Sequence, residues 1–288
     1  MKSWKIGAIA GLIAGIFRGV AQTIAILIGS KIGLPYYFMP APPETPIIFI
    51  TMREISIAII WGIILGVIYS KIYDKIPGAY IKRGIYYGLA LFLIFSIRTA
   101  IIAGPYISIA ETVSWIFYGV FGWLAYGIVL GILFEFLHSR HHPPRKRIRI
   151  RDYDIGSGLT SGAIAGLVFG LIISLTNIFT NIWIYKYHPM TVTLSFLTLQ
   201  SIFHIGVNTF YGIFFGVMFA MFYDRVPYQG IKKGLVYGLI VYLITSFQVA
   251  FYGIVNTWYD FAIAWSYSAF LAFIAYGLVL GAIYKPPK

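Results

Sequence analysis

The residues best suited to do chemistry in this chain are a few charged side chains that interrupt its apolar segments. Arg18 and Arg98 lie inside such segments, and Glu54 and Glu111 lie near the starts of two others. A charge at the centre of a bilayer costs at least ~2.5 kcal/mol, so it must face a partner or a polar cavity. These four residues therefore predict a binding site or pathway for a polar or anionic solute.

Uncharged polar residues extend this candidate site. Gln200, His204 and Asn208 recur every four residues, so they share one face of a helix. Gln248 interrupts a later apolar segment. The alternative interpretation is that these groups hydrogen-bond from helix to helix within a packed bundle. We expect them to line, with the charged residues, an asymmetric polar cavity between the two halves of the chain.

The chain lacks the residues that most enzyme and cofactor chemistry requires. It contains no cysteine, which excludes disulfides, thiolate metal sites and cysteine nucleophiles. Of its five histidines only His204 lies clearly inside an apolar segment, so haem ligation by two histidines is not expected. HxxxH, GxSxG, GxGxxG and P-loop patterns do not occur in a suitable context. We expect no enzyme activity, no cofactor and no metal site.

The elements that must position these residues are membrane-spanning helices. The 288 residues are 59% hydrophobic and 11% charged, whereas soluble domains carry about 25% charged residues. Each apolar segment exceeds the ~18 residues that a helix needs to cross the hydrocarbon core. The sequence therefore predicts an all-α membrane protein with about eight transmembrane helices. The segments lie near residues 6–28, 52–73, 84–103, 112–137, 156–185, 196–223, 233–255 and 261–284.

The sequence also repeats itself. Residues 62–89 align without a gap on residues 212–239, with 13 identities in 28 positions that include Asp, Pro and Lys. The last segment of each half contains AYGIVLG or AYGLVLG at the same shift of 150, and the first segments share GAIAGL at a shift of 155. An even number of spans in each copy gives both copies the same orientation in the membrane. This pattern predicts two parallel four-helix repeats.

We place the boundary between the two repeats in the basic segment that separates them. Glu54 in the first repeat corresponds to His204 in the second, and Arg98 corresponds to Gln248. Because these polar positions differ, we expect the site to be asymmetric. The predicted parts are a first repeat at residues 1–137, a linker at 138–154 and a second repeat at 155–288.

Glycines repeat with the spacing of a helix face. They recur every four residues in the first segment of each repeat and as GxxxG pairs in most other segments. Helices in lipid associate through close backbone approach, which small residues permit. We therefore expect tight helix packing along these faces. The two longest series are Gly7, Gly11, Gly15 and Gly19, and Gly158, Gly162, Gly166 and Gly170.

Basic residues are distributed unequally between the two sides. With the N-terminus in the cytoplasm, 17 of the 22 Lys and Arg residues fall on the cytoplasmic side and three on the other. Cytoplasmic loops carry such an excess of positive charge. We expect a protein of the cell membrane with both termini in the cytoplasm. The six basic residues in Arg140–Arg151 favour contact with anionic lipid headgroups or simply reflect this topology, and nothing in the chain indicates nucleic-acid binding.

Each repeat carries the pattern Tyr-Asp-(Lys/Arg)-(Ile/Val)-Pro after its second apolar segment, followed by a basic pair. The pattern supplies Asp74 and Lys82 in the first repeat and Asp224 and Lys232 in the second. Proline ends the preceding helix, and the aspartates are suited to cap backbone amides. We interpret these residues as a structural turn or, alternatively, as a cytoplasmic gate.

Two function classes fit these observations. The first is a transporter or channel for a small solute or anion, because arginine suits an anion and a chain of buried carboxylates for cation coupling is missing. The second is a non-catalytic subunit of a larger membrane complex, which needs only a tightly packed bundle and basic contacts. Its partners would be other membrane subunits or further copies of the same chain.

Overall fold

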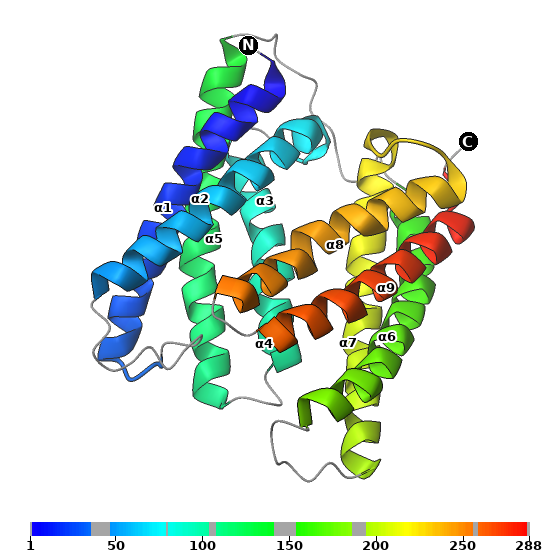
Figure 1. Cartoon of the computed structure of the whole chain (residues 1–288). Helices are drawn as coiled ribbons and strands as arrows, with labels where there is room; N and C mark the ends of the chain where they lie inside the picture. The colour runs from blue at the N-terminus through cyan, green and yellow to red at the C-terminus, as the bar shows by residue number, and fades with distance from the viewer. Residues whose placement is uncertain are drawn as a thin grey trace. The chain divides into compact units, whose positions relative to one another are not determined.

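The protein is an integral multi-pass membrane protein of α-helices (Figure 1). Within the described residues, eight helical stretches are long and apolar enough to cross a membrane. Contacts divide the chain into unit 1, Met1–Asp152, and unit 2, Tyr153–Lys288. The computed structural model describes residues 2–35, 47–78, 80–103, 108–140, 154–185, 194–255 and 259–286.

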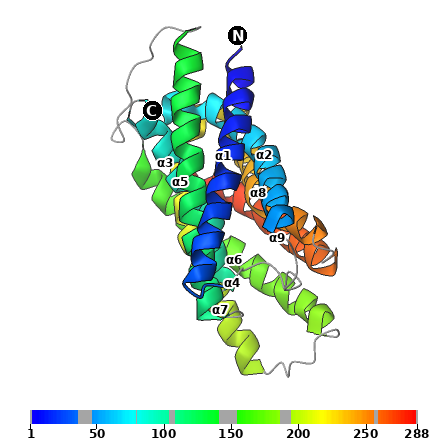
Figure 2. The same cartoon turned by 90° about the vertical axis from the view of Figure 1, so that its left-hand side faces the viewer.

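In unit 1, helix α1 packs between α2 and α5, and α5 also packs against α3 (Figure 2). A π-helical segment, Leu93–Ile97, joins α3 to α4, so that these pieces form one span from Ile81 to Ile101. The apolar segments expected from the sequence thus correspond to these helices. Their bounds are α1 Ser3–Lys31, α2 Ile47–Ile72, α3 Ile81–Phe92, α4 Arg98–Ala103 and α5 Ile109–Ser139.

In unit 2, α6 packs between α7 and α9, and α9 also packs against α8. A single 3₁₀ turn, Tyr223–Arg225, follows α7, as the 3₁₀ turn Tyr73–Lys75 follows α2 in unit 1. Each unit therefore has the same order of neighbouring helices. The bounds in unit 2 are α6 Ile155–Tyr185, α7 Leu194–Phe222, α8 Gly230–Val255 and α9 Tyr259–Ile283.

Glycines bring the first two helices of each unit into backbone contact. A Cβ atom added at Gly11 would collide with the carbonyl group of Gly62 in α2. In unit 2, a Cβ atom added at Gly162 would lie 2.5 Å from the carbonyl oxygen of Gly212 in α7. Real Cβ atoms do not approach so closely, and helices in lipid rely on such small residues to pack. The spacing of the glycines therefore has the packing role that the sequence indicated.

The same contacts fix how α1 compares with α6. Gly19 packs against Ile55, and Gly170 packs against Ile205, which stands 150 positions after Ile55. Gly170 thus takes the place of Gly19 at a shift of 151, whereas the GAIAGL motif suggested 155. Since glycine recurs every four residues in both helices, sliding one helix by four residues preserves the glycine pattern. Packing contacts distinguish the two alignments, and they place Phe169 where unit 1 has Arg18.

Buried tyrosines make matching hydrogen bonds in the two units. The Tyr126 hydroxyl donates to the Gly62 carbonyl at 2.9 Å, and the Tyr276 hydroxyl donates to the Gly212 carbonyl at 2.9 Å. These bonds tie α5 to α2 and α9 to α7. Tyr69 is different, because its buried hydroxyl has no hydrogen-bond partner among the described residues.

We predict that Tyr126→Phe and Tyr276→Phe each lower the free energy of unfolding by about 1 kcal/mol, because each removes a buried hydrogen bond. Tyr69→Phe is the matched control, since it removes a hydroxyl that makes no such bond. Thermal unfolding in detergent measures all three variants. An equal loss in Tyr69→Phe would contradict the assignment of the effect to these hydrogen bonds.

Candidate functional site

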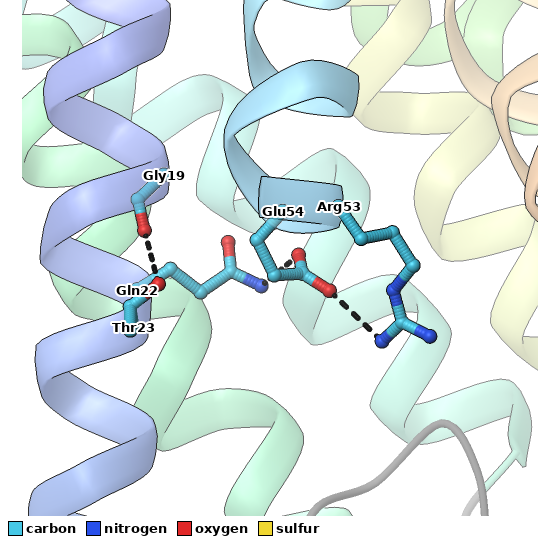
Figure 3. A network of polar contacts seen from close by, with 5 residues as sticks. All are labelled: Gly19, Gln22, Thr23, Arg53 and Glu54. Carbon is cyan, nitrogen blue, oxygen red and sulfur yellow. Dashed lines mark hydrogen bonds and ion pairs between the residues drawn. The ribbon is translucent and has the colours of Figure 1, made fainter. Parts of the chain in front are cut away.

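Glu54 of α2 is the centre of a polar network in unit 1 (Figure 3). It is 6% exposed, and one of its carboxylate oxygens accepts a hydrogen bond of 3.2 Å from Gln22 Nε2 of α1. The other oxygen forms an ion pair with Arg53 Nη2 at 3.3 Å. The charge of Glu54 is therefore balanced by its own neighbour in the chain.

Arg18 lies one helical turn before Gln22 on the same face of α1. Its side chain is 6% exposed, and its Cζ atom lies 4.0 Å from the ring centroid of Trp123 in α5. Trp123 in turn stacks on Phe95, with ring centroids 4.8 Å apart and ring planes 15° apart. The guanidinium is thus held by an aromatic surface, through a cation–π interaction.

The aromatic contact leaves the hydrogen-bonding groups of Arg18 unsatisfied by the protein. Its buried Nε atom has no hydrogen-bond partner, and its charge has no ion-pair partner, among the described residues. An arginine has five N–H donors, and a buried donor without an acceptor costs about 1–3 kcal/mol. Arg18 is therefore a buried charge that the described part of the chain does not compensate.

Arg83 shows how this fold satisfies a structural arginine. Its side chain is 3% exposed, and its Cζ atom lies 4.4 Å from the ring centroid of Tyr73, much as Arg18 lies over Trp123. Its Nε atom, however, donates a hydrogen bond of 3.1 Å to the Gly78 carbonyl. Both arginines lie over an aromatic ring, but only the Nε atom of Arg83 has an oxygen acceptor among the described residues.

Unit 2 has an apolar pair at the position with the matching helix contacts. Phe169 occupies the place of Arg18, and Phe273 stands 150 positions after Trp123. Phe169 is 3% exposed, and its ring centroid lies 4.5 Å from that of Phe273 in an edge-to-face arrangement. The helix packing of these units is therefore compatible with an aromatic residue at this position.

The buried charges of unit 1 have an excess of positive sign. Arg98, at the start of α4, is 5% exposed and interacts with other residues of the chain. Positive side chains outnumber negative ones among these buried groups, which makes the interior of unit 1 suited to an anion. Within the described residues of this unit, the buried side chains with a formal charge are Arg18, Arg83, Arg98 and Glu54.

Glu111 is used at a helix end. Its carboxylate accepts hydrogen bonds from the Ser108 amide at 2.7 Å and the Ser108 hydroxyl at 2.8 Å. The Ser108 hydroxyl in turn accepts from the Glu111 amide at 3.1 Å. This reciprocal pair is a capping box that begins α5. The structure thus engages Glu111 with Ser108, whereas the sequence placed it near the cavity.

The polar stripe of α7 belongs to unit 2. His204 and Asn208 are both buried, and the Asn208 side-chain amide donates to the His204 carbonyl at 2.8 Å within the same helix. A narrow gap beside Asn208, lined by apolar side chains such as Phe169 and Phe273, has no room for a water molecule. Gln200 and Gln248 lie on α7 and α8, but their side chains fall outside the described residues.

In each unit, the second residue of the basic pair binds the turn that follows the second helix of the unit. Arg83 binds the turn through Gly78 in unit 1. In unit 2, Lys233 Nζ donates to the Tyr223 carbonyl at 2.9 Å and lies 3.8 Å from the centroid of the Tyr223 ring. Sequence reasoning selected the lysines that precede Arg83 and Lys233 and missed these two residues. A buried Tyr lies four residues after Arg83 and four residues after Lys233, on the same helix face, and could have indicated them.

The residues that the sequence selected at this turn are less enclosed. Lys82, Lys232 and Asp224 are exposed, and Asp74 is half-buried. Beyond α9, burial raises the pKa of Tyr284 to about 12, and the nearby negative charge of Asp154 adds to this effect. Tyr284 therefore stays neutral at neutral pH.

The basic linker expected to contact lipid headgroups lies largely outside the described residues. Of it, Arg140 is exposed at the end of α5, with its Cζ atom 4.0 Å from the centroid of the Phe136 ring. In the described stretches of the chain, no group of three or more His, Asp or Glu side chains is placed to hold a metal ion.

Comparisons with protein-family models, with curated proteins and with solved structures found no match to this chain. The site must therefore be interpreted from its own chemistry. The group that distinguishes it is Arg18, which is buried on Trp123 without an acceptor for its Nε atom.

We predict that Arg18→Phe does not destabilise the protein and raises its free energy of unfolding by about 3 kcal/mol. The reason is that it replaces an uncompensated charge with the residue type found at Phe169. The matched variant Arg83→Phe is expected to lose at least about 1 kcal/mol, because it removes a bond to Gly78. Thermal unfolding in detergent compares them. A loss of stability in Arg18→Phe as large as in Arg83→Phe would assign Arg18 a purely structural role.

Proposed function

We propose that this protein transports a small anion across the membrane and that Arg18 is its anion contact. The observation that carries this proposal is the buried guanidinium of Arg18, held on Trp123 and without a hydrogen-bond acceptor for Nε among the described residues. A bound anion would supply the missing acceptor and the missing countercharge together. Buried ionisable groups in membrane helices are most often part of such pathways.

The energetic balance favours a ligand over a purely structural arginine. A charge in the middle of a span costs at least ~2.5 kcal/mol, and a desolvated cation–π contact returns about 2 kcal/mol. The unsatisfied donors add a further cost, so the stack alone does not repay the burial. Such a cost is typical of residues kept for function, at the expense of stability.

The negative charge of Glu54 also supports this proposal. Its two oxygens are engaged by Gln22 and Arg53, so its charge is held within the network beside Arg18. A carboxylate fixed there would limit the positive potential at the site and so allow an anion to leave after it has bound. Release matters in a pathway, because conduction and transport require binding that is weak enough to reverse.

We further propose that the two units are parallel repeats of one four-helix unit and that only the first has kept the charged site. The matching glycine contacts, tyrosine hydrogen bonds and basic turns support this duplication. The excess of Lys and Arg on one side supports a cell-membrane protein whose termini are both cytoplasmic. In this proposal the site is asymmetric because Phe169 has replaced the cation in unit 2.

Flux into proteoliposomes tests the transport proposal. We expect the purified protein to accelerate uptake of at least one small anion, and Arg18→Gln to lower that rate at least about tenfold, a loss of ~1.4 kcal/mol. Lys71→Gln is the matched control, because it removes an exposed positive charge and should leave the rate unchanged.

The opposite result identifies the alternative function. Absence of flux for chloride, acetate, phosphate and sulfate, together with partner chains that co-purify in fixed ratio, would overturn transport and identify a subunit of a membrane complex. Equal losses in Arg18→Gln and Lys71→Gln would show that surface charge, not the buried site, controls the rate.

Cysteine labelling tests the orientation. The chain has no cysteine, so single Cys variants can be labelled without background. We expect a membrane-impermeant maleimide added outside intact cells to label Lys31→Cys but not Lys82→Cys or Lys232→Cys, all of which are exposed positions. In lysed cells all three should react. Labelling of Lys82→Cys from outside would contradict a cytoplasmic N-terminus, and opposite results at 82 and 232 would contradict parallel repeats.

A further inference from the structure

The stacking of Arg18 determines which of its atoms can face a ligand. The guanidinium lies over the Trp123 ring, with Cζ 4.0 Å from the ring centroid, so one of its faces is occupied. Its N–H groups point outward in the guanidinium plane, because the group is planar and its donors form a rigid fork. A ligand therefore approaches the edge of the guanidinium rather than its covered face.

The Nε atom identifies the edge in question. In Arg83, with the same type of aromatic contact, Nε donates to a carbonyl oxygen at 3.1 Å. In Arg18 the corresponding atom is buried, and no described residue accepts from it. The fold thus supplies an oxygen acceptor at this donor in Arg83, whereas no described residue supplies one in Arg18.

Gly122 of α5 accommodates the side chains of Gln22 and Arg18. A Cβ atom added there would lie 3.2 Å from Gln22 Oε1 and 3.5 Å from Arg18 Cγ. Both polar side chains of α1 therefore pack against a position of α5 that has no side chain. A larger residue at this position would press on Gln22 and Arg18.

We infer that the ligand of Arg18 is an oxyanion, such as a carboxylate or a phosphate, bound side-on through two of its oxygens. This inference rests on the proposed role of Arg18 as the anion contact. Nε–H and the adjacent Nη–H are parallel donors, and two oxygens of a carboxylate or phosphate match their spacing. A halide ion is a single spherical acceptor and gains nothing from the fork. The site therefore selects oxyanions over halides of equal charge.

Arg18→Lys separates the shape of this group from its charge. Lysine keeps the positive charge but has neither the planar fork nor the planar surface that stacks on Trp123. Binding of acetate, inorganic phosphate and chloride is measured by calorimetry on the detergent-purified full chain. We expect acetate or phosphate to bind the wild-type protein at least tenfold more tightly than chloride does. Arg18→Lys should remove this preference and leave chloride affinity within about twofold.

Two results overturn the inference. Chloride that binds the wild-type protein as tightly as the oxyanions, or Arg18→Lys that keeps the full preference for oxyanions, would show that charge alone selects the ligand. Lys71→Gln serves as the control for exposed charge, and Arg18→Phe, expected to fold, serves as the control without a cation. Wild-type protein that binds no anion and shows no flux would overturn both this inference and the transport proposal.

Native mass spectrometry distinguishes a soluble oxyanion from a lipid headgroup, which presents the same phosphate chemistry. A phospholipid that stays with the wild-type protein and with Lys71→Gln, but leaves in Arg18→Phe and Arg18→Lys, would support the oxyanion inference and overturn transport. Soluble acetate or phosphate that binds without retained lipid would support both. A lipid held equally by all variants, with no soluble oxyanion bound, would overturn the inference.

Discussion

The contact between α1 and α2 is the constraint on which the rest of unit 1 depends. Helices inside a bilayer gain no hydrophobic energy from touching one another, so their association depends on how closely their backbones approach. Gly7, Gly11 and Gly19 allow α1 to lie directly against the backbone of α2. That contact sets the rotation of α1, and the rotation turns Arg18 and Gln22 toward the interior of the unit.

Dense packing limits the acceptors that a buried charged side chain can reach. Where glycines and aromatic rings fill the space between helices, a polar side chain has few acceptors within reach and little water to replace them. Most buried polar groups are satisfied in such a bundle, as Arg83 is by Gly78 and Glu54 is by Arg53. Arg18 differs from Arg83 because its Nε atom is buried without an acceptor among the described residues.

The sequence was sufficient to predict the spans, because length and hydropathy leave few alternatives for an apolar segment. It also selected Arg18 as a candidate site residue, and the structure buries this side chain. It did not identify Trp123, since an aromatic residue among many has no pattern that marks it as the partner of a cation. It also misaligned α1 with α6, because glycine at every fourth residue allows a slip of one turn without loss of pattern. Only the contact of Gly170 with Ile205 fixes the register.

That register changes the comparison between the units in a way that bears on function. With the shift of 151, Arg18 over Trp123 corresponds to Phe169 against Phe273, and each pair is buried in the same kind of helix packing. The apolar pair shows that this packing does not require a charged residue at that position. A cation whose burial is costly, in a place where an aromatic residue also fits, supports the proposal that Arg18 binds an anion. The structural argument for an anion site therefore comes from the difference between the units as much as from Arg18 itself.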